Sequence, residues 1–325
     1  MRRDIVIFEY SLILFLSLST VVLLYLISKT KSPRALRKIS PPLFCLFLSV
    51  FCWTLTTSNI AIQWILFTTE AFTINRGNVL FAQCSGVAAL SVRRFYYCTV
   101  VGVYIQRVYY MAFPFNKPRH LNTSIVAMTL TVSLTASAVF VSVSMITSDF
   151  SNPFISKECF SFNCIPLYTV LPQKITRIME LMFTSTTILL GALMNIIYRR
   201  LKFSFQNIRH IKVNLVHDNS KSQLFPKLPL VKVELADLDS DLRINLFARY
   251  LFFVQFVFET VPYITDLIIA PMIGKPLGEY IGPYGLVGGS LDTFACTLAY
   301  YLITRKKHVQ VIPKNGMHET AKNNN

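Results

Sequence analysis

Charged residues are scarce in this chain, and acidic residues are the scarcer kind. Only 15% of its 325 residues are Asp, Glu, Lys or Arg, with 16 acidic residues against 32 basic ones. Hydrophobic residues make up 53% of the sequence, and the mean hydropathy is +0.48. A soluble domain needs more polar residues than this to cover its surface. The composition therefore indicates a membrane protein.

The spacings that bind metals or nucleotides are also missing. The sequence contains no His-Glu-x-x-His and no Cys-x-x-Cys, which are common in metal sites. The run from Gly285 to Gly289 follows no strand, so it is no nucleotide-binding loop. Its Gly-x-x-x-Gly spacing instead predicts close packing between helices. We therefore predict no enzyme activity, no cofactor and no metal site.

The main feature of the sequence is a series of long apolar runs. Each has about 20 or more mostly apolar residues, enough to cross a hydrocarbon core of roughly 30 Å as a helix, and the first is too long for a secretory signal. The seven expected spans are residues 5–28, 39–67, 79–113, 121–147, 176–198, 245–271 and 283–303. The sequence predicts an all-α membrane protein, with one seven-transmembrane-helix bundle over residues 1–303 and a basic cytoplasmic tail over residues 304–325.

The basic residues between the spans predict an orientation. With the N-terminus outside, the inner loops and the tail hold 21 Lys and Arg, and the outer side holds seven. Lys and Arg concentrate on the cytoplasmic side of membrane proteins, so we expect an extracellular N-terminus and a cytoplasmic C-terminus. This basic face should attract anionic membrane lipids. Its residues lie in short loops beside the membrane, and the chain has no recognisable nucleic-acid module, so no nucleic-acid partner is expected.

The end of the third run carries a distinctive pattern. Gln106, Arg107 and Val108 are followed by Pro114, seven residues after the arginine, and by Phe115. The pattern resembles G-protein-coupled receptors, whose third helix ends in an acidic-Arg-aromatic triplet with a proline at the same spacing. In this chain the acidic residue and the aromatic residue of the triplet are absent.

Further features resemble the same receptors. Pro262, within "FVFETVP", resembles the proline that kinks their sixth helix. The disulfide of these receptors implies a bridge from Cys84 to Cys164, with Cys159 as a rival partner of Cys84 and a local bridge between Cys159 and Cys164 as another alternative. The seventh run reads "GGSLDTFACTLAYY" where these receptors have Asn-Pro-x-x-Tyr, so Asp292 is only a loose analogue.

Among seven-helix receptors, the chain resembles the nematode serpentine chemoreceptors. The similarity lies in its length, short N-terminus, Phe- and Tyr-rich helices, degenerate arginine triplet ending in "FPF" and short basic tail. Within that superfamily the resemblance leans towards the Srbc class. It implies a chemosensory receptor in the plasma membrane of sensory cells, with a small-molecule ligand outside and a heterotrimeric G protein inside. A ligand-gated channel or transporter is the alternative, and a purely structural membrane protein comes third.

Ionisable residues inside the apolar runs are the candidate site residues. Such groups are costly at bilayer depth and usually face a bundle interior or a cavity. They are Glu9, Arg93, Arg94, Glu180, Arg249, Glu259, Asp266 and Asp292.

Two of them, Arg93 and Arg94, lie where a receptor of this kind would hold its ligand. They could instead be structural, with one arginine reaching the outer interface and the other paired with Glu180 or Glu259. A helix beginning only at Phe95 would make both of them interfacial anchors. We predict that Glu259 faces the bundle interior near one of the two arginines.

The cytoplasmic side carries the remaining predictions. We place Arg107 at the cytoplasmic mouth, with Asp241 as the partner in an exposed ion pair. Residues 201–215 form a basic amphipathic pattern that extends the fifth helix. This extension could lie on the membrane surface or contact a G protein.

Overall fold

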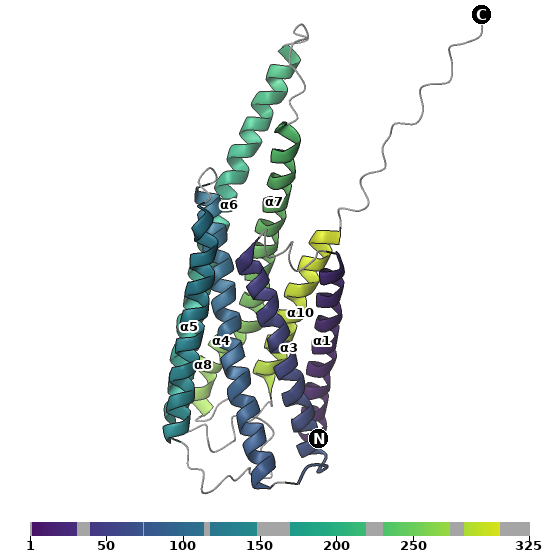
Figure 1. Cartoon of the computed structure of the whole chain (residues 1–325), viewed down its shortest axis with the longest axis vertical. Helices are drawn as coiled ribbons and strands as arrows, with labels where there is room; N and C mark the ends of the chain where they lie inside the picture. The colour runs from purple at the N-terminus through teal and green to yellow at the C-terminus, as the bar shows by residue number, and fades with distance from the viewer. Residues whose placement is uncertain are drawn as a thin grey trace, which may run out of the picture.

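The chain forms a bundle of long helices that run side by side (Figure 1). The computed structural model describes residues 2–30, 40–73, 75–113, 118–147, 170–218, 230–273 and 283–305. In chain order the helices are α1 (Arg2–Thr30), α3 (Pro41–Thr68), α4 (Arg76–Ala112), α5 (Arg119–Thr147), α6 (Val170–Asp218), α7 (Leu230–Gln255), the π-helical turn η2 (Phe256–Thr260), α8 (Val261–Ile273) and α10 (Tyr284–Arg305). Within the described ranges every regular element is helical, which confirms the predicted all-α class.

Six of the described helical segments are long and apolar enough to cross a membrane. They are Arg3–Thr30, Pro41–Thr68, His120–Thr147, Lys174–Arg200, Arg243–Ile269 and Tyr284–Arg305. A bundle of this kind is typical of a multi-pass membrane protein, because a lipid-embedded backbone must satisfy its own hydrogen bonds. Helix α4 is also long, at 37 residues, but it contains four arginines and is not among the six.

The helix boundaries agree with the sequence for most spans, and two helices extend further. The predicted extension of the fifth span is present, because α6 continues without a break to Asp218. Helix α7 begins at Leu230, well before the expected start at residue 245. Both helices project beyond the rest of the bundle at the end away from the N-terminus (Figure 1).

Helix α4 occupies the centre of the packing. It contacts α3, α5 and α6, while α1 packs against α3 and α10, and α7 packs against α6 and α10. The contact between α6 and α7 is close, because a side chain at Gly191 would overlap the ring of Phe252. Arg249 on α7 adds to this contact by donating to Asn195 at 3.0 Å and lying over the Tyr198 ring at 4.4 Å.

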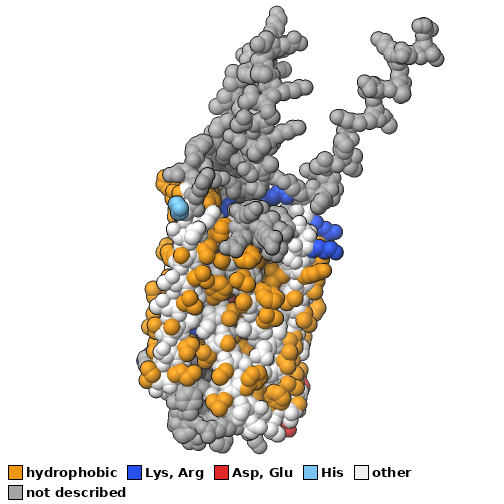
Figure 2. Space-filling view, in the orientation of Figure 1, with side chains coloured by type: hydrophobic (Ala, Val, Ile, Leu, Met, Phe, Trp, Pro, Cys, Tyr) orange, Lys and Arg blue, Asp and Glu red, His pale blue; other side chains and the backbone are white. Residues whose placement is uncertain are grey.

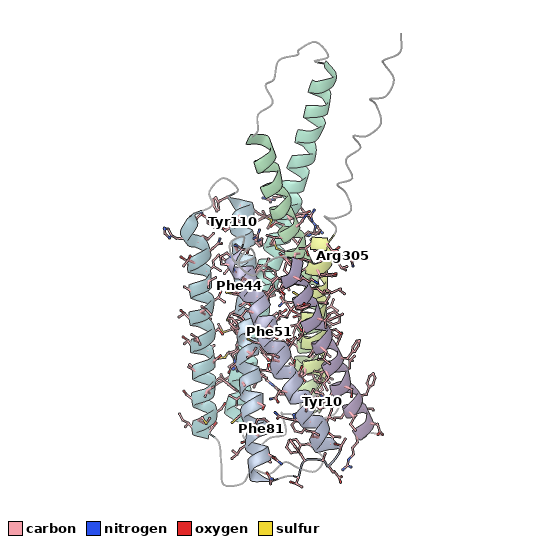
Figure 3. All side chains as sticks on the ribbon, turned by 45° about the vertical axis from the view of Figure 1, so that its right-hand side comes forward. Tyr10, Phe44, Phe51, Phe81, Tyr110 and Arg305 are labelled. Atoms are coloured by element: carbon pink, nitrogen blue, oxygen red, sulfur yellow. The ribbon has the colours of Figure 1, made fainter. Side chains whose placement is uncertain are left out.

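The outer surface of the bundle is apolar. Figure 2 shows hydrophobic side chains spread over the length of the bundle, with Lys and Arg gathered at one end. Phe51 and Phe81, both labelled in Figure 3, are 41% and 54% exposed. Large apolar side chains exposed over a whole surface indicate a lipid environment.

The interior holds two apolar clusters. One contains Val50 on α3 and Tyr96 on α4, and the other contains Trp53 and Ala89 on the same two helices. On both α3 and α4, residues of the two clusters are therefore only one or two helical turns apart. Arg93 lies between Ala89 and Tyr96 on α4, so the polar residues described below lie where the two clusters meet.

Candidate functional site

Two residues of α4 begin the candidate site. Arg93 and Tyr97 are four residues apart, so they share one face of the helix. The Nε of Arg93 donates to the Tyr97 hydroxyl at 2.8 Å, and the guanidinium carbon lies 5.5 Å from the centre of the Tyr97 ring. The tyrosine thereby fixes one edge of the guanidinium.

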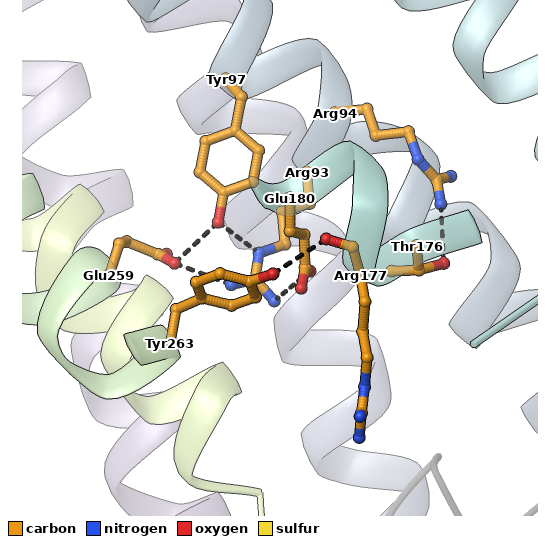
Figure 4. A network of polar contacts seen from close by, with 8 residues as sticks. All are labelled: Arg93, Arg94, Tyr97, Thr176, Arg177, Glu180, Glu259 and Tyr263. Atoms are coloured by element: carbon orange, nitrogen blue, oxygen red, sulfur yellow. Dashed lines mark hydrogen bonds and ion pairs between the residues drawn. The ribbon is translucent and has the colours of Figure 1, made fainter. Parts of the chain in front are cut away.

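Glu259 of η2 completes the tight part of the site. Its Oε2 accepts from Arg93 Nη2 at 2.7 Å and from the Tyr97 hydroxyl at 2.7 Å. Figure 4 shows the three side chains converging from two elements of the bundle. The prediction that Glu259 lies near one of the two arginines is therefore confirmed, and that arginine is Arg93.

Glu180 of α6 lies on the other side of the same guanidinium. Its Oε1 is 3.5 Å from Arg93 Nη1, and the two side chains are 21% and 19% exposed. This ion pair is longer than the one with Glu259. Arg93 thus joins α4, α6 and η2, with one close carboxylate and one loosely held carboxylate (Figure 4).

The local sequence explains why Glu259 faces the interior. Pro262 has no N–H, so an α-helix at this point would leave the carbonyl of Phe258 without its donor. The chain instead forms the π-helical turn Phe256–Thr260, in which the N–H of Val261 bonds to the carbonyl of Phe256. A π turn places one extra residue in the helix and is frequent at functional sites.

Glycines on α10 make room for this turn. A Cβ added to Gly288 would lie 2.6 Å from the Phe258 carbonyl oxygen, and one at Gly289 would lie 3.1 Å from Glu259 Oε1. The same test at Gly285 finds no atom within 4 Å. Close packing was predicted for the Gly285–Gly289 spacing, but the adjacent pair Gly288 and Gly289 makes the contacts.

Arg94 points in a different direction from Arg93. Its side chain is 4% exposed, its guanidinium carbon lies 3.9 Å from the centre of the Phe140 ring on α5, and its Nη2 donates to Thr176 on α6 at 3.3 Å. Helix α4 begins at Arg76, so the alternative in which it begins at Phe95 is wrong. Arg94 is a buried residue of the bundle.

A small cavity lies between α4 and α6 beside these groups. It is lined by Leu90, Arg93, Arg94, Tyr97, Thr176, Met179, Glu180 and Phe183. The volume open to the centre of a water-sized molecule is about 10 Å³, which is about enough for one water molecule. Any larger molecule could enter the cavity only if the helices separated.

A further carboxylate, Asp292 of α10, contacts Tyr96, the residue that precedes Tyr97 on α4. The Tyr96 hydroxyl donates to Asp292 Oδ2 at 2.6 Å, and Asp292 is fully buried. The rings of Tyr96 and Tyr97 are 6.1 Å apart. Adjacent tyrosines of α4 therefore contact two carboxylates, one on α10 and one on η2. These roles of Tyr96 and Tyr97 were not predicted, although the four-residue spacing of Arg93 and Tyr97 is visible in the sequence.

Arg107 occupies a separate polar cluster near the far end of α4. Arg107 was predicted to form an exposed ion pair, and that exposure is wrong, because its side chain is 1% exposed. Arg107 Nη2 donates to Gln106 Oε1 at 3.0 Å, and Ser40 at the start of α3 donates to the same oxygen at 2.8 Å. Gln106 Nε2 donates to Asn122 of α5 at 2.6 Å. A side chain without charge, Gln106, thus connects Arg107 to two neighbouring helices.

Some predicted site residues lie outside the described residues. The side chain of Asp241 is one, so its pairing with Arg107 stays a prediction. Cys84 is exposed on α4, but Cys159 and Cys164 are not described, so the disulfide also stays a prediction. Pro262 is in the place that the structure explains, immediately after the π turn.

The comparisons with known proteins add no relatives. No protein-family model matches the chain, and a search of curated proteins finds no significant match. The functional argument therefore depends on the sequence pattern and on the geometry of the site.

Proposed function

We propose that this multi-pass membrane protein is a chemosensory G-protein-coupled receptor of the plasma membrane of sensory cells. In this proposal α4 is the third of seven spans, the N-terminus is extracellular and the C-terminus is cytoplasmic. The central packing of α4 against α3, α5 and α6 supports its role as a span. Arg93, Arg94 and Arg107 are largely covered by the surrounding helices, where bilayer-depth charges are usually found.

The observation that carries the proposal is the ionic site around Arg93. Three elements of the bundle meet on one guanidinium, beside a cavity whose walls include two charged groups from α4 and one from α6. A ligand that binds these groups changes the relative free energies of helix arrangements. A G protein at the opposite end could then respond to that change.

The cytoplasmic end in this orientation offers a matching structure. Helices α6 and α7 project there (Figure 1), and the cluster of Gln106 and Arg107 lies at the same end of α4. In the proposal the projecting helices contact the G protein. If Asp241 of α7 pairs with Arg107 in the resting state, then Asp241→Asn raises ligand-independent signalling.

Cells that express the chain can test the receptor proposal against the channel or transporter alternative. A small-molecule screen should record G-protein activation and ion current in the same cells. A G-protein response without a ligand-dependent current supports the receptor. A current that persists when heterotrimeric G proteins are blocked contradicts it.

We expect Arg107→Ala to reduce G-protein activation by at least about tenfold, within the range of allosteric coupling, while ligand binding stays near the wild-type level. Arg107 contacts Gln106 in a cluster that joins three helices, far from the Arg93 site. The measurements are ligand binding and signalling, each normalised to surface expression. Arg305→Ala is the control, because this arginine is exposed at the same end of the bundle. A wild-type response from Arg107→Ala would favour the channel.

The orientation predicts that Asn122 carries no glycan. Asn122-Thr123-Ser124 is the one Asn-x-Ser/Thr sequon of the chain, and we place it at the cytoplasmic start of α5. Its side-chain oxygen also accepts hydrogen bonds from Gln106 and Tyr110 at 2.6 and 3.0 Å. Endoglycosidase should leave the mobility of the protein unchanged, whereas a sequon tag fused ahead of Met1 should be glycosylated. If endoglycosidase removed a glycan from Asn122, the proposed orientation would be contradicted.

A further inference from the structure

Arg249 lies where the junction of α6 and α7 reaches the membrane boundary. Its guanidinium carbon is 4.4 Å from the centre of the Tyr198 ring, and Tyr198 is two residues before the end of the apolar span Lys174–Arg200. Tyrosine is enriched at the level of the lipid headgroups, and a long arginine side chain can extend towards them. The charge of Arg249 is therefore within reach of the headgroups of one leaflet.

The neighbouring residues hold one edge and one face of this guanidinium. Arg249 Nε donates to Asn195 Oδ1 at 3.0 Å, and Asn195 Nδ2 donates to the Gly191 carbonyl at 2.9 Å. The Tyr198 ring beneath the guanidinium packs against the apolar interior of the bundle. These contacts leave the two terminal nitrogens, Nη1 and Nη2, without a partner in the described part of the chain.

Arg249 also has no carboxylate partner among the described residues. The nearest acidic residue along its own helix is Asp241, eight residues before it and about 12 Å away along the helix axis. On α6, no Asp or Glu lies between Glu180 and Asp218. A charge near the membrane that has no counter-charge on its own helices favours an anionic partner from outside the chain.

Arg199 supplies a second positive charge at this junction. It lies four residues after Asn195, so the two residues share the face of α6 that contacts Arg249. Its side chain is exposed and makes no ion pair with the described residues. Arginine binds phosphate through pairs of parallel N–H donors, and the terminal nitrogens of Arg249 provide such a pair.

We propose that Arg249 and Arg199 form a binding site for the phosphate group of an anionic phospholipid, in the leaflet at the end of the bundle where α6 and α7 project. Basic residues between helices near the membrane boundary commonly bind such headgroups. The acyl chains lie along apolar side chains deeper in the membrane, such as Phe253, four residues after Arg249 and 53% exposed.

A lipid held by both arginines joins α6 to α7 and stabilises their contact. The inference does not depend on the receptor proposal, since a channel or transporter could bind the same lipid. Its failure would therefore leave the receptor proposal untouched, and the reverse also holds.

The test uses the full chain, purified in detergent and titrated with one probe at a time. The probes are phosphatidylglycerol, which is anionic, phosphatidylcholine, whose choline balances the phosphate charge, and inorganic phosphate. Phosphatidylglycerol should raise the thermal midpoint in a saturable manner, and the other two should not at the same concentration. No effect of phosphatidylglycerol, or an equal effect of phosphatidylcholine, would overturn the proposal. An equal effect of inorganic phosphate would also overturn it, because the site would then bind a soluble anion.

Three variants locate the site. Arg249→Gln should weaken phosphatidylglycerol binding by about tenfold, because it removes both terminal donors. Arg199→Gln should weaken it by a smaller factor, and it tests the site even if Arg249→Gln does not fold, because Arg199 is exposed. Arg305→Gln is the matched control, an exposed arginine over the Tyr301 ring at the same end of the bundle but on α10, and its Kd should equal that of the wild type.

Two outcomes with these variants would contradict the site. Equal losses in all three would mean that the lipid is attracted to the basic end as a whole. Wild-type binding by both Arg249→Gln and Arg199→Gln would mean that the lipid binds elsewhere.

Discussion

Glu259→Gln is expected to destabilise the protein by about 3–5 kcal/mol, the usual cost of removing one partner of a buried ion pair. The substitution leaves Arg93 with the 3.5 Å contact to Glu180 and weakens the acceptor of the Tyr97 hydroxyl. Arg93 and Glu259 are 19% and 10% exposed, so little water is available to compensate. The measurements are surface expression in cells and the thermal midpoint of the purified protein.

A double-mutant cycle separates this ion pair from general damage. In the variant with both Arg93→Gln and Glu259→Gln no unpaired charge remains between these two positions, so its loss should be smaller than the sum of the single losses. Glu70→Gln is the control, since exposed ion pairs contribute only about 0–1 kcal/mol and Glu70, which pairs with Arg3, is 73% exposed. Additive losses at Arg93 and Glu259 would contradict the contact.

Gly288→Ala should cost about 1–3 kcal/mol, the range for overpacking a well-packed interior, with the value near the upper end. The new Cβ would lie 2.6 Å from the carbonyl oxygen of Phe258. That oxygen belongs to the backbone of the π turn, so it cannot move as a flexible side chain could. The measurement is the thermal midpoint of the purified protein.

The same helix contains a matched control for this substitution. Gly285→Ala places a Cβ where no atom lies within 4 Å, and alanine is the better helix former by about 1 kcal/mol. Its thermal midpoint should equal or exceed that of the wild type. If both alanine variants lost the same stability, the contact between α10 and the π turn would not be the cause.

The sequence predicts the helices better than it predicts their contacts. Long apolar runs identify membrane-crossing helices because hydrophobic length is a local property of the chain. The start of α7 at Leu230 was missed because the prediction relied on apolar runs. Its first turns include Lys232, Glu234, Asp237 and Asp239, and a helix outside the membrane needs no long apolar run.

The site was predicted in part. Glu259 could be expected near Arg93 or Arg94 because a charge inside a membrane needs a partner, but the choice between the two arginines stayed open. The roles of Tyr96 and Tyr97 were missed, since a tyrosine among apolar residues gives no sign of its hydrogen-bond partner. The burial of Arg107 was also missed. Its uncharged acceptor, Gln106, gave no sign of a polar cluster reaching Ser40 and Asn122 on other helices.

The number of residues in the π turn before Pro262 determines the side of the helix on which Glu259 lies. An α-helix advances by one residue for each rotation of about 100°, and η2 contains one residue more than regular α-helix would place there. If the turn changed to ordinary α-helix, the segment on one side would rotate by about that angle relative to the other. Glu259 would then leave the face that meets Arg93. Formation of the ion pair between Arg93 and Glu259 is therefore coupled to the rotation of α8 about its own axis. A ligand that disturbs the ion pair would favour rotation of this helix.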